Sequence, residues 1–204
     1  MKANLFIIVA PSGAGKTSLV RALVSRLPSL QISISHTTRA PRPAEIHGID
    51  YFFLDKQSFQ NHIDQALFLE YATVHGNFYG TSKEWVRSRL NEGIDIVLEI
   101  DWQGARQIRT LFPDAVSIFI LPPSLPVLEQ RLRTRAQDNE AVIQLRLQAA
   151  KEELRHYSEC KYLVVNEDFL EAVSKLEAIV NAERQLCPRE ALRQKARLAH
   201  LLES

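Results

Sequence analysis

The sequence predicts an α/β protein in which helices cover a parallel β-sheet. Continuous apolar runs at residues 94–100 and 116–121 are typical of strands that are buried on both faces. Amphipathic helical patterns alternate with these runs, as they do in proteins built from strand–helix–strand units. With 204 residues and a hydrophobic fraction of 46%, the chain 1–204 is long and apolar enough to form a single domain with a real core.

The first strand is expected at residues 5–9, and the segment that follows it is the strongest signal in the chain. Residues 10–17 read Ala-Pro-Ser-Gly-Ala-Gly-Lys-Thr and open an amphipathic helix. Small residues let backbone N–H groups converge on phosphate oxygens, while Lys16 can reach terminal phosphates and Thr17 can offer its hydroxyl to Mg²⁺. Ala10 stands where this pattern usually has Gly, but Gly13 and Gly15 are present, so we expect a nucleotide phosphate loop to form.

The middle of the chain predicts a smaller inserted part. Apolar positions at helical spacing end at Pro28, and the segment 32–53 then alternates before it becomes rich in Thr, Arg and Pro. A second strand signal at 50–54 makes a short inserted sheet the simplest interpretation. Helices are predicted from Asp55 to about Gln65 and from a Ser82 cap through Leu90.

The last third of the chain is mainly helical. An arginine-rich helical pattern covers about 124–157 with an interruption near 136–139, and a short strand follows at 162–165. Two further helices, about 170–186 and 189–202, are predicted to be separated by Pro188. Leucines form a modest apolar stripe in the last helix, for which we expect packing on the core, with dimerisation as a hypothesis; they are Leu192, Leu198, Leu201 and Leu202.

Composition narrows the classes of function and location. A formal charge of +1 gives no electrostatic support for nucleic-acid or membrane-surface partners. Cys160 and Cys187 have no Cys or His at metal-ligand spacing, so they are expected to be plain thiols of a reduced compartment. The N-terminal apolar run is too short for a signal peptide or a membrane span, and a cytoplasmic location is expected.

Two polar segments suggest a second ligand. Arg39 and Arg42 flank Pro41 and are followed by Tyr51, a set that could bind one phosphate, although a solvated Arg-Pro loop would have the same composition. Glu70 precedes an aromatic and hydroxyl cluster at 76–81. An ionised carboxylate accepts hydrogen bonds only, so Glu70 could take the N1–H and amino protons of guanine; the alternative is a surface helix residue.

These motifs, in this order, resemble those of the guanylate kinases, P-loop enzymes that phosphorylate GMP with ATP. The matching stretches are 10–18, 35–51, 70–81, 99–104 and 131–146, so the resemblance covers nearly the whole chain. It implies a P-loop NTPase-type parallel sheet, with a core formed by 1–34, 84–125 and 158–204, a GMP-binding part at 35–83 and a helical lid at about 126–157. The implied reaction is in-line phosphoryl transfer that makes GDP and ADP, in purine nucleotide metabolism and GMP recycling.

The resemblance also implies a role for individual residues. ATP and Mg²⁺ would be bound by Pro11, Ser12, Gly13, Ala14, Gly15, Lys16, Thr17 and Ser18, with Thr17 at the metal and Asn166 near the adenine. Guanine would contact Ser35, Glu70 and Thr81, the GMP phosphate would contact Arg39, Arg42, Tyr51 and Tyr79, and Asp101 would serve the Mg²⁺ water shell or the acceptor. Arg131, Arg135 and Arg146 would close over the ATP phosphates and, with Lys16, Arg39 and Arg42, form the catalytic set.

Several alternatives stay open at this point. Asp101 could simply cap a helix, the lid arginines could form a solvated helix face, and Ala136 stands where the family usually has Gly, which puts the local lid turn in doubt.

A ribose 1,5-bisphosphate kinase would use a similar core but would give Glu70 and Thr81 no base to bind. A catalytically inactive guanylate-kinase-like interaction module would not need Lys16 and Thr17. A P-loop GTPase is disfavoured because its Asn-Lys-x-Asp type motif is missing. The acceptors are expected to be GMP, with dGMP as a candidate, and the chain to be a monomer or homodimer.

Overall fold

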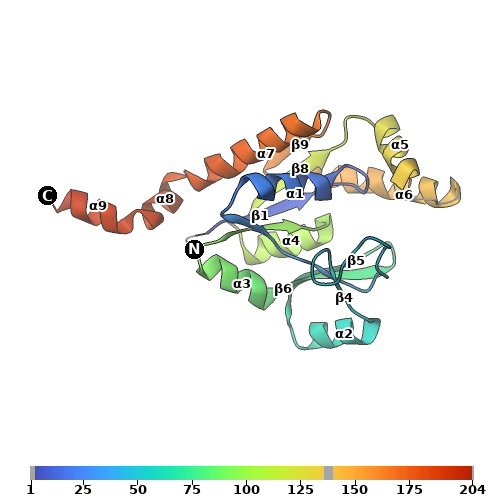
Figure 1. Ribbon diagram of the computed structural model, residues 1–204, viewed down its shortest axis with the longest axis horizontal. Coiled ribbons are helices and arrows are strands. Elements are labelled where there is room, and N and C mark those ends of the chain that lie inside the picture. Colours follow the sequence, from blue (N-terminus) through green and yellow to red (C-terminus); the bar gives the residue numbers. More distant parts are fainter. Residues whose placement is uncertain (1–2, 136–139, 204) are drawn as a thin grey trace.

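Five parallel strands form the main sheet of this protein, seen here in a computed structural model that describes residues 3–135 and 140–203 (Figure 1). The order of the strands places β1 in the middle, between β7 and β8. Because all strand pairs are parallel, the loops that follow them gather at one edge. The predicted α/β class is confirmed. The strands, in spatial order, are β2 (Leu30–Ile32), β7 (Asp95–Glu99), β1 (Leu5–Val9), β8 (Val116–Leu121) and β9 (Tyr162–Val165).

Helices cover both faces of the main sheet, and the strand side chains alternate between them. From β1, Phe6 and Ile8 enter the cluster beneath α1 and α7, whereas Leu5 and Ile7 enter the cluster beneath α3 and α4. All four side chains are at most 3% exposed, which explains why this strand reads as an unbroken apolar run. The covering helices are α1 (Lys16–Arg26), α3 (Lys83–Asn91), α4 (Trp102–Leu111) and α7 (Phe169–Arg184).

A second, mixed sheet lies below the main one, beside α2 (Lys56–Asp64) (Figure 1). The expectation of one inserted sheet over 32–53 is wrong at its start, because Ile32 pairs with Val97 in the main sheet. A hairpin over 68–82, which was not predicted from the sequence, has a turn with His75 and Gly76 at φ +49° and +77°. The second sheet contains β4 (Phe52–Phe53), β3 (His36–Thr37), β6 (Asn77–Ser82) and β5 (Phe68–Val74).

Two predicted helix starts are confirmed by capping hydrogen bonds. The Asp55 carboxylate accepts from the Ser58 N–H at 2.8 Å at the start of α2. The Ser82 hydroxyl oxygen accepts from the Trp85 N–H at 3.3 Å at the start of α3. Each cap satisfies a backbone donor that the helix itself leaves unpaired, which is why these residue types mark helix starts.

The arginine-rich region forms a helical pair beside the main sheet, at the right of Figure 1. It comprises α5 (Leu125–Arg135), α6 (Glu140–Leu154) and the short 3₁₀ helix η1 (Arg155–Glu159). Leu128 of α5 and Leu147 of α6 belong to a small apolar cluster that joins the two helices. The predicted interruption at 136–139, including Ala136, lies outside the described residues.

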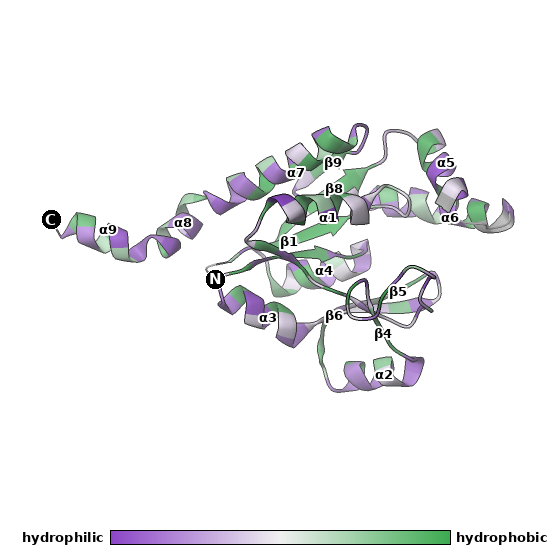
Figure 2. Ribbon diagram, viewed as in Figure 1, coloured by the Kyte–Doolittle hydropathy of each residue, from purple (hydrophilic) through white to green (hydrophobic). Residues whose placement is uncertain are grey.

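The C-terminal helices α8 (Cys187–Arg193) and α9 (Lys195–Leu202) run away from the body of the protein (Figures 1 and 2). The predicted break at Pro188 is wrong, because Pro188 lies in the first turn of α8, where its missing N–H costs nothing. The expected core packing of the leucine stripe is also wrong: Leu198, Leu201 and Leu202 are 39%, 67% and 84% exposed.

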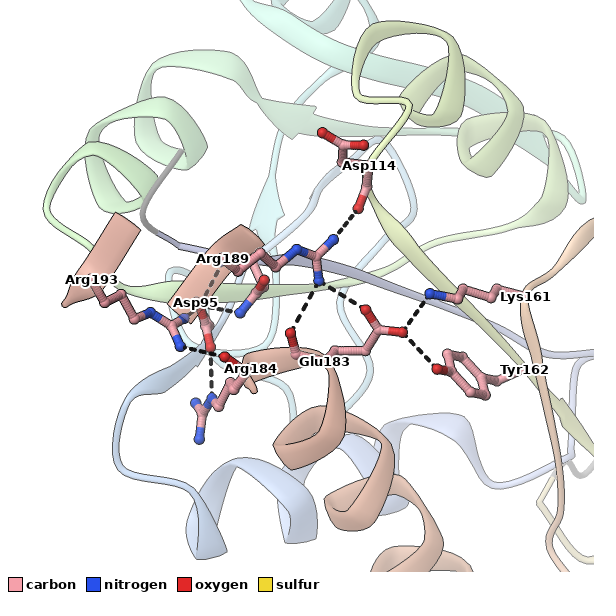
Figure 3. Close-up of polar contacts among 9 residues, drawn as sticks. Asp95, Asp114, Lys161, Tyr162, Glu183, Arg184, Arg189 and Arg193 are labelled. Carbon is pink, nitrogen blue, oxygen red and sulfur yellow. Dashed lines mark hydrogen bonds and ion pairs between the residues drawn. The ribbon is translucent and has the colours of Figure 1, made fainter. Parts of the chain in front are cut away.

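Two buried carboxylates hold α8 against the body (Figure 3). Glu183, at the end of α7, is 1% exposed and accepts from the Arg189 Nη1 at 2.9 Å as well as from Lys161 and Tyr162, each at 2.6 Å. Asp95, the first residue of β7, accepts from the Arg184 Nε of α7 at 2.7 Å and lies 3.6 Å from the Arg193 Nη2 of α8. These ion pairs, rather than leucine packing, fix the direction in which the chain leaves the core.

Both cysteines are free thiols, as expected, with Cys160 half-buried and Cys187 exposed. None of the helices in the described ranges is long and apolar enough to cross a membrane.

Candidate active site

The loop between β1 and α1 has the backbone conformation that its glycines predict. Gly13 and Gly15 lie at φ +89° and +91°, a region that other residues rarely adopt. A Cβ on Gly15 would also approach the Asn166 side-chain nitrogen to 2.5 Å, so Gly15 is needed for close packing as well. Ala10 is buried at the end of the strand and does not disturb this turn. The loop forms with Ala in the first position.

The two signature residues of the loop face the carboxyl end of β7. Lys16 Nζ donates to the backbone oxygen of Ile100 at 2.9 Å, and the Thr17 hydroxyl donates to the Glu99 carboxylate. Asp101 caps α4 by accepting from the Gly104 N–H at 2.9 Å, so the capping role considered for it is present. A hydroxyl and a carboxylate side by side are the oxygen ligands that Mg²⁺ prefers.

The arginine loop is built around a carboxylate that the sequence analysis did not single out. Arg39 Nη2 donates to both oxygens of Glu45, at 2.8 and 2.9 Å, and Glu45 also accepts from the Arg42 backbone N–H at 2.8 Å. The Arg39 guanidinium lies 5.3 Å from the centre of the Tyr51 ring, which itself lies 6.1 Å from the Tyr79 ring. Burial, with the nearby charge of Glu99 adding to it, raises the pKa of Tyr51 to about 12, so this phenol keeps its proton.

Glu70 is a buried carboxylate on β5, not the surface helix residue of the alternative interpretation. It is 3% exposed and accepts from the Thr81 hydroxyl of β6 at 2.5 Å. Burial raises the pKa of Glu70 to about 7, against the opposing effect of the Thr81 hydrogen bond. On the other side, α4 approaches so closely at Gly104 that a Cβ there would overlap the Glu70 carboxylate.

One cleft collects most of the residues that the sequence analysis named. The phosphate loop forms one wall, and the second sheet with the arginine loop forms the other. His75 and Glu153, which were not named from the sequence, also line it. The predicted residues in this cleft are Pro11, Ser12, Gly13, Gly15, Lys16, Thr17, Ser35, Arg39, Arg42, Tyr51, Glu70, Tyr79 and Asp101.

A second cavity lies on the other side of the loop, against α5. Arg131 lines it, and its guanidinium lies 3.4 Å from the backbone oxygens of both Ala14 and Asn166. The Asn166 side chain is buried and donates to the Ala14 oxygen at 2.7 Å, so it holds the phosphate loop in place. The predicted loop residue Ser18 also lines this cavity.

The other two predicted lid arginines are placed less fully. Arg146 lies on α6 and lines neither of these two cavities in the described part of the chain. Arg135 ends α5, and its side chain lies outside the described residues. The described residues contain no cluster of three or more His, Cys, Asp or Glu side chains suited to a metal.

A phosphate loop at the carboxyl edge of a parallel sheet, with arginines across a shared cleft, defines the chain as a P-loop nucleotide-binding protein. The family model for guanylate kinase matches residues 2–183. The chain is 58% identical to a guanylate kinase of Alcanivorax borkumensis over 98% of this chain and 97% of that one, and 59% identical to one of Coxiella burnetii over 90% and 89%. The crystal structure of guanylate kinase from Anaplasma phagocytophilum matches with a TM-score of 0.77 and 32% identity, over 92% of this chain and 89% of that one. The protein belongs to the guanylate kinase family, and it is an enzyme, a nucleoside monophosphate kinase.

Proposed function

We propose that this protein transfers the γ-phosphoryl group of ATP to GMP and releases GDP and ADP. The observation that carries the proposal is the buried Glu70 carboxylate, bonded to Thr81, in the same cleft as the phosphate loop. Guanine offers two donors to such a carboxylate, and adenine lacks the N1 donor. Because a buried polar group left unpaired is costly, this contact would select guanine by a large factor.

The loop and the arginines divide the two phosphate-bearing ligands between them. The loop amides and Lys16 would hold the ATP phosphates, and Arg39 and Arg42, with the Tyr51 and Tyr79 hydroxyls, would hold the phosphate of GMP. An oxygen of that phosphate would attack the γ-phosphorus in line, while the bond to the ADP oxygen breaks and its electrons leave with ADP. Positioning and neutralisation of charge would supply the catalysis, and no covalent enzyme intermediate is needed.

Mg²⁺ fits the side chains that face the loop. The Thr17 hydroxyl and the Glu99 carboxylate would hold the ion directly or through its water shell, with Asp101 nearby. Bound there with the ATP phosphates, the ion would neutralise charge as the phosphoryl group moves. We propose the same lid assignment as the sequence suggests, with Arg131, Arg135 and Arg146 closing over ATP and excluding water.

The remaining parts of the proposal concern organisation and partners. Residues 35–83 would form the GMP-binding part and about 126–157 the lid of a single domain. The base contacts proposed for Ser35, Glu70 and Thr81 do not involve the 2′ position of the sugar, so dGMP is proposed as a second acceptor. We propose a cytoplasmic enzyme whose partners are nucleotides rather than nucleic acids or membranes.

The test is an acceptor screen. ADP release from Mg·ATP is measured with GMP, dGMP, AMP, UMP or ribose 1,5-bisphosphate, for the wild type and Glu70→Ala, with the exposed Glu84→Ala as the matched control. Turnover that depends on GMP, is lost in Glu70→Ala and persists in Glu84→Ala supports the proposal. Turnover only with the sugar phosphate, or nucleotide binding without turnover, would reject it.

A further inference from the structure

Glu153 joins two parts of the protein that are 141 residues apart in sequence. Its Oε2 accepts a hydrogen bond from the backbone N–H of Ser12 in the phosphate loop, at 3.0 Å. Glu153 lies in the last turn of α6, the second helix of the proposed lid. Its neighbour Glu152 differs completely, because it is 60% exposed and pairs only loosely with Arg155 at 3.3 Å.

Partial burial of the Glu153 carboxylate costs free energy unless a hydrogen bond compensates for the lost hydration. Its carboxylate lines the ligand cleft, where Lys16, His75 and Asp101 are the charged and titratable groups around it. Burial raises the pKa of Glu153, in spite of the Ser12 hydrogen bond and the charge of Lys16. A half-buried carboxylate is stabilised by a specific hydrogen-bond partner, and the Ser12 N–H is that partner.

The chain just after Glu153 is also fastened to the core. In η1, the His156 ring stacks on Trp102 of α4 with centroids 3.9 Å apart. Glu159 pairs with Arg106 and Arg109 of the same helix. The end of α6 is therefore fixed at two places: the phosphate loop, through Glu153, and α4, through η1.

Arg146 precedes Glu153 by seven positions, or about two helical turns, so the two residues lie on the same side of α6. We propose that Glu153 is a positioning residue that fastens the end of α6 to the phosphate loop through the Ser12 amide, so that Arg146 is delivered to the donor phosphates in a fixed register. This inference rests on the proposed function for the role of Arg146. In this proposal, the hydrogen bond from Ser12 to Glu153, and not the charge of Glu153, determines the position of Arg146.

Two conservative variants separate the hydrogen bond from the charge. Glu153→Gln keeps the length and a carbonyl oxygen that can accept from Ser12, but it loses the charge. Glu153→Asp keeps the charge but is one methylene shorter. Positioning by the hydrogen bond predicts that Gln retains most of kcat, whereas Asp and Ala lower kcat by about tenfold to a hundredfold, with the KM for GMP unchanged. Glu152→Ala is the matched control and should behave as the wild type.

Two further readouts distinguish positioning from a general loss of structure. Deuterium exchange of the peptide that contains Ser12 should speed up in the Asp and Ala variants but not in Gln, a result that does not depend on turnover. If Glu153 acts through Arg146, the double variant Glu153→Ala with Arg146→Ala should be no slower than Arg146→Ala alone. Thermal unfolding identifies any variant that fails to fold. If Glu153→Ala fails to fold, the comparison of Glu153→Gln with Glu153→Asp decides the result.

The outcomes that overturn the inference are specific. Wild-type kcat in Glu153→Ala or Glu153→Asp would remove the positioning role. Tighter ATP binding in both Gln and Ala would show instead that the carboxylate competes with the donor phosphates for the loop. Effects of Glu153→Ala and Arg146→Ala that multiply would mean that the two act independently. A wild-type protein without GMP-dependent turnover would reject the proposed function, whereas the exchange result would still decide the contact with Ser12.

Discussion

Gly104 and Glu70 lie so close that position 104 has no room for a side chain. A Cβ built on Gly104 would overlap one Glu70 oxygen and approach the carboxyl carbon to 3.0 Å. Gly104 lies in the first turn of α4, which Asp101 caps. The close approach of α4 therefore sets one wall of the proposed base pocket, and this wall is backbone rather than side chain.

Gly104→Ala is expected to displace the Glu70 carboxylate and to raise the KM for GMP by about tenfold or more, since a displaced carboxylate loses its paired donors. The KM for ATP should change little. Ala is a better helix residue than Gly, so helix propensity alone would not lower the melting temperature. Steady-state kinetics with each nucleotide varied in turn checks the prediction, and equal changes in both KM values would contradict it.

The raised pKa of Glu70 predicts that GMP binding improves as the pH rises. Guanine needs the ionised carboxylate, and with a pKa of about 7 the ionised fraction grows about tenfold between pH 6 and 8. The KM for GMP should fall by a similar factor over this range. Glu70→Gln is the control, because it removes the part of the pH dependence that comes from Glu70 and keeps the part that comes from ionisation of the GMP phosphate. An unchanged pH profile in Glu70→Gln would show that Glu70 is not the titrating group.

The same shift has the opposite sign for stability. Because the folded pKa of Glu70 lies above the usual value of 4.5, folding favours the protonated form. This contribution is fully present below pH 4.5 and is lost as the pH rises through about 7. The free energy of unfolding, measured with denaturant, should differ less between pH 5 and pH 8 in Glu70→Gln than in the wild type. The other titratable groups are the same in both proteins, so the difference between them reports Glu70.

Lys16→Ala and Arg42→Ala are each expected to lower turnover by about a hundredfold or more, because they remove charges that face the proposed transferring group. The fold should persist, since the Arg42 side chain is 56% exposed and its ion pair with Glu45 is 3.6 Å long. Lys56→Ala, on the exposed side of α2, is the control. Wild-type turnover in either active-site variant, measured as ADP release, would remove that residue from the catalytic set.

Arg189→Ala should lower the free energy of unfolding by about 1–3 kcal/mol, because it takes one partner from a carboxylate that is 1% exposed. Lys161 and Tyr162 remain as partners and limit the loss. The exposed Arg197→Ala on α9 serves as the control and should be within experimental error of the wild type. Denaturant titration measures both, and GMP-dependent turnover should not change in either.

The sequence was sufficient for the parts of the fold and site that depend on local patterns. The phosphate loop, the buried strands, and the Asp55 and Ser82 caps follow from residue types at fixed spacing. Glu70 could be named because a carboxylate beside an aromatic and hydroxyl cluster suits a purine pocket. Family membership follows from several such motifs in one order.

The parts that were missed depend on how the chain folds back on itself, over a few residues or over most of its length. Glu45 neutralises Arg39 only because the arginine loop folds back on itself. Glu153 meets Ser12 across most of the chain, and nothing in the sequence separates it from Glu152. The leucines of α9 have helical spacing whether or not a core is within reach, so spacing alone could not show that they stay exposed.

The exposed thiol at Cys187 offers a practical use of the way α8 leaves the body. Asp95, which anchors α8, is the first residue of β7, whereas the phosphate loop follows the last residue of the parallel neighbouring strand β1. The two therefore lie at opposite edges of the main sheet. Burial raises the pKa of the other thiol, at Cys160, which slows its alkylation. A maleimide dye or a surface linker would therefore attach preferentially at Cys187, on the edge remote from the nucleotide cleft, and would leave that cleft open to solution.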